Sequence, residues 1–156
     1  DNMIISGLAT SAPRIVALLD FELSHISDPL CDLGYFCLVY CLPPPRGIAG
    51  VEGAEGKLPS IDAVIARYCE LTGALKDVTD AAKRKAIVQV YMAQACHKLG
   101  GIVHGVVVRA MIGNASDVEG GLKMADLCHG VSMLGLGLLD EALEALGGQP
   151  APASKL

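Results

Sequence analysis

The residues best placed to do chemistry lie near the start of the chain. Asp20-Phe21-Glu22 follows directly on an apolar run, Ile15 to Leu19, whose length and β-branched residues predict a buried strand rather than a helix. A carboxylate at the end of a buried strand is held rigidly at the edge of a site. A single aspartate in such a place more often caps a turn. A second polar residue, Asn2, favours a chemical role here.

Asn2 precedes another short apolar run, Met3 to Ile5, and the segment between the two runs is rich in turn residues. If the runs pair as an antiparallel hairpin, the start of the first strand lies beside the end of the second. Asn2 and Asp20 then come together. Because an amide oxygen and a carboxylate are hard oxygen donors, the pair suits Mg²⁺ held between protein and phosphate oxygens.

Three motifs surround these residues: Asp1-Asn2 before a strand, DFELS at 20–24, and DPLCDLGY at 28–35. Together they resemble the C-terminal lobe of the aminoglycoside phosphotransferase and choline kinase-like family. The form fused to acyl-CoA dehydrogenases, which typically reads LDWELSTxGDPLxDLAYF, is the most similar. Further similarity at 66–73 and 110–116 extends the resemblance over most of the chain.

The resemblance implies a fold and a site. The fold is α+β and mostly helical, the C-terminal lobe of a protein-kinase-like fold, with one β-hairpin followed by about four helices. In the family, as in protein kinases, a catalytic-loop Asn and the Asp of the DFG-like segment hold the metal ions, and Asn2 and Asp20 match them. Glu22 matches an acid near the metal. Asp32 matches an acid that braces the catalytic loop, although an acid early in a helix is also favoured by the helix dipole.

The catalytic base of that family is not among these residues. Its catalytic loop reads HGDxxxDN, so the proton-accepting Asp falls upstream of Asp1, and no catalytic residue is expected in this chain. The N-terminal lobe, with its phosphate-contacting Lys and adenine-binding hinge, is not matched either. Because phosphoryl transfer needs all of these parts together, we expect these residues alone to be inactive and to bind neither ATP nor Mg²⁺ tightly.

Composition predicts one domain with a surplus of apolar surface. The 156 residues are 52% hydrophobic and 19% charged, with a mean hydropathy of +0.46. We expect a lobe at 1–147 with a flexible tail at 148–156, and a missing N-terminal lobe or other protein chains covering the apolar surface. The net charge of −5 and the scattered basic residues argue against nucleic acid. Charged residues interrupt every long apolar stretch, so no transmembrane segment is predicted.

Cysteines and histidines give weak signals. The six cysteines form no CxxC pair, which indicates reduced thiols in an intracellular protein. A zinc site built from Cys96-His97 and Cys128-His129 is disfavoured, because adjacent helical residues point in different directions. His97 and His104 share a helix face without a third partner, so interior hydrogen-bonded histidines are expected.

The chain ends in Ser154-Lys155-Leu156 after a Gly/Pro/Ala-rich tail. A terminal SKL is the sequence read by the peroxisomal import receptor, and a chance sequence is the alternative. The tripeptide predicts a peroxisomal location.

Helix signals follow the hairpin in order. Asp28-Pro29 begins a helix that runs to about Tyr40 or Leu42, with Pro29 at its first helical position. Residues 43–59 are a loop, either a plain connector or a gate to a substrate cleft. Ser60 caps a helix over 61–72 that Gly73 ends. The later signals predict a helix over 80–112, in which Gly101 and Gly105 allow close approach of a neighbouring helix. They also predict a last helix from a capping box at 116–119 to about 146, buried on several sides either in the core or against another chain.

Two functions of different classes fit. The first is the C-terminal part of an ATP- and Mg²⁺-dependent phosphotransferase with a hydroxyl acceptor, for which the resemblance implies a hydroxyacyl-CoA. The second is a non-catalytic remnant of a kinase lobe that serves as an accessory subunit of a larger assembly, with a mitochondrial location. The presence of Asn2 and Asp20 favours the enzyme, since a remnant has no need of them.

Overall fold

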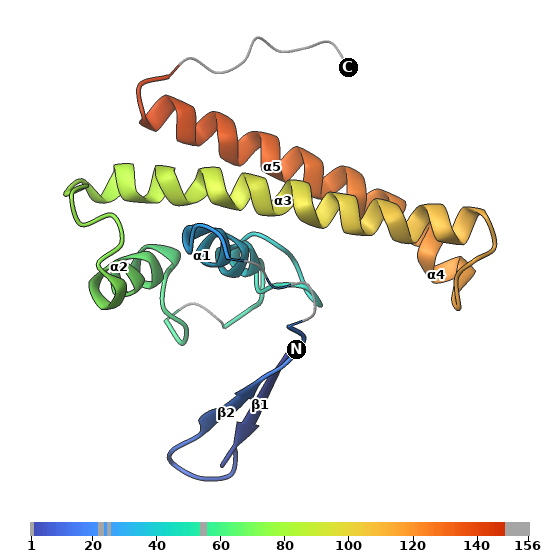
Figure 1. The fold of residues 1–156 in the computed structure, drawn as a ribbon, viewed down its shortest axis with the longest axis horizontal. Helices are drawn as coiled ribbons and strands as arrows, with labels where there is room; N and C mark the ends of the chain where they lie inside the picture. The colour runs from blue at the N-terminus through green and yellow to red at the C-terminus, as the bar shows by residue number, and fades with distance from the viewer. Residues whose placement is uncertain (1, 22–23, 25, 54–55, 149–156) are drawn as a thin grey trace.

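A computed structural model describes residues 2–21, 24, 26–53 and 56–148 of the chain. Within them the fold is mostly helical with one two-stranded sheet, as the sequence predicts (Figure 1). The strands are β1 (Met3–Ser6) and β2 (Arg14–Leu18). The helices are α1 (Leu30–Cys37), a 3-10 turn η1 (Leu38–Tyr40), α2 (Ile61–Thr72), α3 (Ala81–Met111), α4 (Val118–Lys123) and α5 (Ala125–Ala145).

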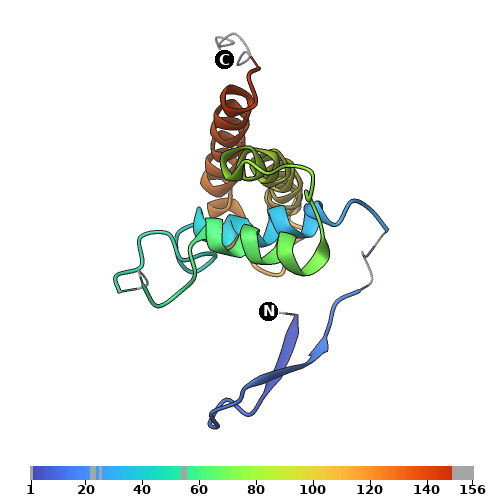
Figure 2. The same cartoon turned by 90° about the vertical axis from the view of Figure 1, so that its left-hand side faces the viewer.

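The predicted hairpin is confirmed. β1 and β2 pair antiparallel, with Met3 opposite Leu18, and a bulge near Ile4 and Ile5 leaves an extra residue on β2. The prediction that β2 is buried is wrong: Ile15 is 60% exposed. None of the described helices packs extensively against the hairpin, which projects away from the helical part of the molecule (Figures 1 and 2). An apolar strand is buried only where another element packs over it.

The helices form layers around α3. The long α3 helix lies between α5 on one side and the pair α1 and α2 on the other (Figure 2). Three helical glycines allow close approaches to α3, since an added Cβ would meet Tyr91 at 2.7 Å from Gly34, Ala110 at 2.7 Å from Gly121 and Cys96 at 2.8 Å from Gly135. The sequence pointed instead to Gly101, which has nothing within 4 Å, and to Gly105, which faces only the end of Arg109. That prediction is wrong.

The core lies between α1, α2, α3 and α5. The residues predicted to pack inward from the first helix, Leu30, Leu33, Cys37 and Leu38, are all buried. The other main members are Ile65, Cys69, Val88, Met92, Ala95, Cys96, Val131 and Leu138.

The starts of α1 and α2 follow the sequence signals closely. The Asp28 carboxylate accepts the Leu30 N–H at 2.9 Å, and the helix begins one residue later than predicted, with Pro29 in the cap position. Ser60 caps α2 by accepting the Ala63 N–H at 3.2 Å. Gly73 ends α2 in the left-handed conformation, as expected.

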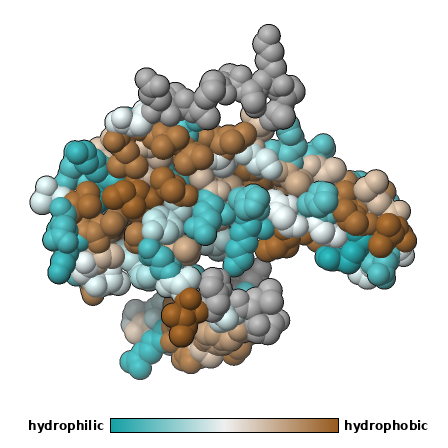
Figure 3. Space-filling model, turned by 45° about the horizontal axis from the view of Figure 1, so that its top comes forward, coloured by the Kyte–Doolittle hydropathy of each residue, from teal (hydrophilic) through white to brown (hydrophobic). Residues whose placement is uncertain are grey.

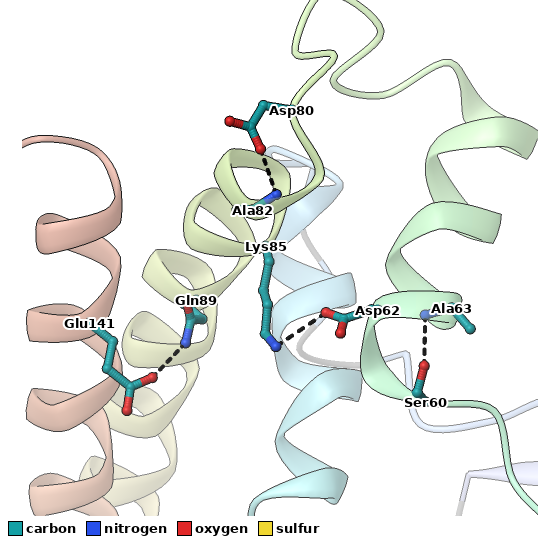
Figure 4. A network of polar contacts seen from close by, with 8 residues as sticks. All are labelled: Ser60, Asp62, Ala63, Asp80, Ala82, Lys85, Gln89 and Glu141. Atoms are coloured by element: carbon teal, nitrogen blue, oxygen red, sulfur yellow. Dashed lines mark hydrogen bonds and ion pairs between the residues drawn. The ribbon is translucent and has the colours of Figure 1, made fainter. Parts of the chain in front are cut away.

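A polar network joins α2, α3 and α5 near the start of α3 (Figure 4). Asp80 caps α3 by accepting the Ala82 N–H at 2.8 Å. Lys85 lies 3.2 Å from the Asp62 carboxylate of α2, and Gln89 donates to Glu141 of α5 at 2.8 Å. Because the side-chain contacts are exposed, each contributes little to the free energy of unfolding. The Asp80 cap is the contact in this network whose removal should have a measurable effect.

Removal of this cap gives a testable result. We expect Asp80→Ala to lower the free energy of unfolding by about 1 kcal/mol, because the first backbone N–H groups of α3 lose their acceptor. Urea unfolding followed by circular dichroism measures the change. Asp77→Ala, three residues earlier and exposed, is the matched control and should stay within about 0.5 kcal/mol of wild type. Equal effects of the two changes would contradict the assignment of Asp80 as the cap.

The C-terminal region differs from prediction. The expected last helix is two helices, α4 and α5, which meet at Met124, and the cap of α4 is Asp117, which accepts the Gly120 N–H at 2.9 Å. Burial of this helix on several sides within the chain is not found, since Met133 is 54% exposed, and contact with another chain stays a prediction. Figure 3 shows apolar side chains spread over the surface around α3 and α5. Exposed apolar side chains on α3 and α5 include Ile102, Val108, Met111, Met133 and Leu136.

The total surface confirms that much of the molecule is uncovered. The solvent-accessible surface is 11087 Å². A compact monomer of 16.2 kDa exposes about 7,500 Å². The chain is therefore less compact than a typical monomer of its mass.

One helical stretch among the described residues, Val118–Ala145, is long and apolar enough to cross a membrane by length and composition alone. Only 17% of its most apolar window is buried. The α5 helix within it packs along α3, as a helix of a water-soluble core also does. The absence of a transmembrane segment therefore stays a prediction.

Candidate functional site

The hairpin brings together the two residues that the sequence selects. The Leu19 N–H donates to the Asn2 carbonyl at 2.9 Å, which extends the ladder by one step and places the side chains of Asn2 and Asp20 side by side. The Asn2 amide nitrogen donates to the Asp20 carboxylate at 2.9 Å. The predicted approach of these residues is confirmed. Both are exposed at the open end of the hairpin.

The backbone at both residues is unusual. Asn2 has a φ of 59° and Asp20 a φ of 68°, in the left-handed region that most residues with a Cβ avoid. Asn and Asp tolerate this region better than other residues. Such conformations concentrate at functional sites, where they aim a side chain in a set direction. The only other such residue in the described part of the chain is Leu75.

The Asn2–Asp20 hydrogen bond uses one polar atom from each side chain. The Asn2 amide oxygen and the second Asp20 carboxylate oxygen make no hydrogen bond to any described residue. Two oxygen donors at one exposed edge fit an ion such as Mg²⁺, which keeps several waters and takes one or two protein ligands together with phosphate oxygens. The donor set is therefore compatible with the predicted metal.

The segment after the hairpin is fixed to the helices at Asp28. One Asp28 oxygen accepts the Leu30 N–H, and the other accepts the Tyr91 hydroxyl of α3 at 2.7 Å. The bond to Tyr91, followed by that to Leu30, lowers the pKa of Asp28. The same bond raises the pKa of Tyr91 to about 12. Tyr68 of α2 adds a third contact by donating to the Pro29 carbonyl at 3.3 Å.

Other predicted residues have different outcomes. Asp32 is exposed on α1 and makes no hydrogen bond or ion pair with a described residue, so its bracing role stays a prediction. Its charge, after the larger effect of burial, helps to raise the pKa of Tyr68. Glu22 and the Ser154-Lys155-Leu156 end lie outside the described residues. Residues 43–53 and 56–59 form the expected loop, around a hollow of about 630 Å³ lined in part by Tyr40, Leu58 and Ser60.

The described histidines and the cysteines do not form a metal site. In the described part of the chain no group of three His, Cys, Asp or Glu side chains could hold a metal ion. The prediction of interior histidines is wrong, since His97 and His104 are exposed and make no hydrogen bond to a described residue. All six cysteines are free, and Cys37 and Cys96 are fully buried in the core. Burial, with the nearby Cys41, raises the pKa of each of these two thiols to about 11.

The buried thiols predict a loss of stability at alkaline pH. An ordinary thiol has a pKa of 9.0, so between pH 9 and pH 11 Cys37 and Cys96 lose their protons in the unfolded chain and keep them in the folded one. The folded state then binds more protons, and the free energy of unfolding falls as pH rises through this window. We expect the free energy of unfolding to fall less over this pH range in a Cys37→Ala/Cys96→Ala variant, because both buried thiols are absent.

Urea unfolding at pH 8.0, below the window of about pH 9 to 11, and at pH 10.5, within it, measures this difference. Cys128→Ala controls for the loss of a thiol that is only partly buried. An identical pH dependence in the double variant and the wild type would contradict the assignment.

Comparison with known proteins identifies the class. The family model of the phosphotransferase enzyme family matches residues 1–81, which include the hairpin, the Asn2–Asp20 pair, α1 and α2. The chain belongs to this family. The match agrees with the resemblance seen in the sequence motifs.

Curated relatives carry the same stretch in much longer chains. The human protein "Acyl-CoA dehydrogenase family member 11" is 31% identical over 127 residues, which are 80% of this chain and 15% of that protein. The chicken (Gallus gallus) protein of the same name is 31% identical over 121 residues, 74% of this chain. Mouse "Acyl-CoA dehydrogenase family member 10" is 29% identical over 120 residues, 74% of this chain and 10% of that protein. The chain thus spans about a seventh or less of these relatives. No solved structure is significantly similar.

Two features of the site have no signal in the sequence. The left-handed backbone at Asn2 and Asp20 depends on how the hairpin ends, and Asn and Asp occur in many other conformations. Tyr91 is 63 residues from its partner Asp28, and only the packing of α1 on α3 brings them together. The spacing of Tyr91 along α3 shows only that its side chain is partly buried, and it does not indicate a partner.

Proposed function

We propose that this chain is the C-terminal lobe of a kinase-like phosphotransferase that uses ATP and Mg²⁺ to phosphorylate a hydroxyl group. The observation that carries the proposal is the Asn2–Asp20 pair, held by a 2.9 Å hydrogen bond with both backbones left-handed. Membership of the phosphotransferase enzyme family supports it. In kinases the same two residue types hold the metal ions that bridge the phosphates.

Asn2 and Asp20 would hold Mg²⁺ through their oxygens. When bound, the ion would neutralise the charge that develops on the transferred phosphoryl group. The contribution of this chain is positional: the paired strands fix the separation of the two side chains, and the left-handed backbones fix their direction. Proton removal from the acceptor would fall to a base from a part of the enzyme upstream of these residues.

For the acceptor we propose a hydroxyacyl-CoA. The support is indirect: the similar human, chicken and mouse proteins carry acyl-CoA dehydrogenase names. The loop of residues 43–59, with its hollow of about 630 Å³, is the part of this chain that we expect to border the acceptor. A peroxisomal address at Ser154-Lys155-Leu156 would suit an enzyme of fatty-acid breakdown.

The apolar surface supports a covering partner. Both faces of the hairpin carry exposed apolar side chains, among them Ile4, Ile15 and Val16. A two-stranded hairpin is at best marginally stable alone in water. We propose that an N-terminal lobe or another protein chain covers it, as the much greater length of the relatives allows.

The test is an assay of the complete native polypeptide with Mg²⁺ and γ-labelled ATP. The expected result is transfer of label to hydroxyacyl-CoA, and not to the matched acyl-CoA that lacks the hydroxyl group. Transfer to another class of hydroxyl compound would overturn the proposed acceptor and leave the proposed phosphotransferase activity standing. Absence of both ATP binding and transfer would overturn the enzyme and favour the accessory-subunit role, which the large exposed surface also allows.

A further inference from the structure

A second hollow lies between α2 and the first turns of α3, and it shares no lining residue with the hollow of the 43–59 loop. Its volume is about 400 Å³, within the range of about 300–1,000 Å³ that is usual for small-molecule sites. Ile65 and Ala66 of α2 and Ala81 and Ala82 of α3 form its apolar wall. Ile65 is only 3% exposed, so the hollow is closed toward the core and open toward solvent.

The alanines in this wall keep the hollow open. Ala66, Ala81 and Ala82 are exposed, and each has only a Cβ with which to occupy the space between the two helices. A longer apolar side chain at any of these positions would extend into the hollow that the alanine lines. The space is therefore available to an apolar group that does not belong to the described chain.

The polar part of the lining carries two cations and one carboxylate. Lys85 of α3 reaches toward α2 and lies 3.2 Å from the Asp62 carboxylate (Figure 4). Arg84 is partly buried, and its Nε donates to the Val78 carbonyl, while its Nη groups donate to no described residue. Two cations and one carboxylate leave the lining with a net positive charge, in a chain whose net charge is −5.

We propose that this hollow binds a small organic carboxylate, whose apolar body lies on the alanine wall and whose carboxylate accepts hydrogen bonds from Arg84 and Lys85. The guanidinium group presents paired N–H donors that match the two oxygens of a carboxylate. The Lys85–Asp62 contact is exposed and weak, so Lys85 can turn to the ligand at little cost.

The charge of the lining selects a carboxylate over a phosphate group. A single negative charge balances the one net positive charge of the lining. A phosphate monoester carries a charge of about −2 at pH 7, which would leave an excess of negative charge beside Asp62. The hollow shares no residue with the Asn2–Asp20 pair, so this inference goes beyond the proposed function and does not rest on it.

Photolabelling of the complete native polypeptide locates such a ligand. The probe is a medium-chain fatty acid with a diazirine on its alkyl chain, and mass spectrometry of the digested protein identifies the labelled peptides. We expect label within residues 61–66 and 81–85, which contain the lining. Excess octanoate should suppress this label, whereas 1-octanol, which has the same chain length without the carboxylate, should not.

Two matched pairs of variants test the wall. Lys85→Gln removes a cation from the lining and should raise the octanoate concentration needed for half-maximal suppression about tenfold. Lys83→Gln, which changes an exposed lysine outside the lining, should leave that concentration unchanged. Ala66→Leu fills the hollow and should block labelling of both segments, whereas Ala63→Leu, on the same helix and outside the lining, should not.

Circular dichroism establishes that each variant is folded, and Lys85→Gln, a change at the solvent-facing side of the hollow, keeps the test open if Ala66→Leu folds poorly. Label found only in other segments, or label unchanged in both Lys85→Gln and Ala66→Leu, would overturn the inference. Suppression by 1-octanol as strong as that by octanoate would also overturn it, because the carboxylate would then not be recognised. Each of these results would leave the proposed phosphotransferase function standing.

Discussion

Replacement of Asp20 by Asn in the complete native polypeptide is expected to lower the rate of ATP-dependent phosphoryl transfer by about 10²- to 10³-fold, with little change in the KM of the acceptor. The substitution removes one negative charge from a proposed metal ligand and preserves its shape. Asn also tolerates the left-handed backbone, with its φ of 68°, so the hairpin should keep its fold. Initial rates at saturating ATP and Mg²⁺ give the measurement.

The matched control for this result is Asp77→Asn. Asp77 is an exposed carboxylate that forms no hydrogen bond or ion pair with a described residue, so the same chemical change should leave the rate near that of the wild type. A loss at Asp20 no larger than the loss at Asp77 would show that the Asp20 carboxylate takes no part in the reaction.

The largest expected effect on stability is that of Met92→Ala. Met92 is 1% exposed in the core between the helices, and its backbone lies against Gly34 of α1. Truncation removes buried methylene groups and leaves a cavity, which costs about 2–5 kcal/mol of the free energy of unfolding. Because domains of this size are stable by only about 5–15 kcal/mol, the loss is a large part of the total.

Met133→Ala is the control for the core effect. Met133 is 54% exposed on α5, so the same truncation should cost no more than about 0.5 kcal/mol. Parallel urea titrations compare the two. A loss at Met133 equal to that at Met92 would mean that α5 is covered in the native assembly and that the exposed face is part of an interface.

The sequence was most informative where local signals determine structure. Two short apolar runs with a turn between them were enough to predict the hairpin and the approach of Asn2 to Asp20. Ser60 and Gly73 marked the ends of α2, because capping and left-handed termination depend on a few neighbouring residues. The oxygen donors of Asn2 and Asp20 already suggested Mg²⁺, and the family motifs added the role of that metal in phosphoryl transfer.

Predictions failed where the answer depends on what packs against an element. An apolar pattern such as Ile15 to Leu19 predicts burial, but it cannot show whether an element that covers it is present within the same chain. Close helix contacts occur at Gly34 and Gly135 rather than at Gly101, because a glycine is needed only where another helix crosses. Tyr91 remained undetected for the same reason, since its partner comes from a distant part of the sequence.

The most direct measurement is the binding of Mn²⁺ to the complete native polypeptide in the presence of ATP, followed by electron spin resonance of the free ion. The account predicts saturable binding by the wild type, and binding about tenfold or more weaker in Asp20→Asn, because the ion loses a charged oxygen ligand. Asp77→Asn should bind as the wild type does. Equal Mn²⁺ affinity in the wild type and Asp20→Asn would contradict the account, because Asp20 would then not be a metal ligand.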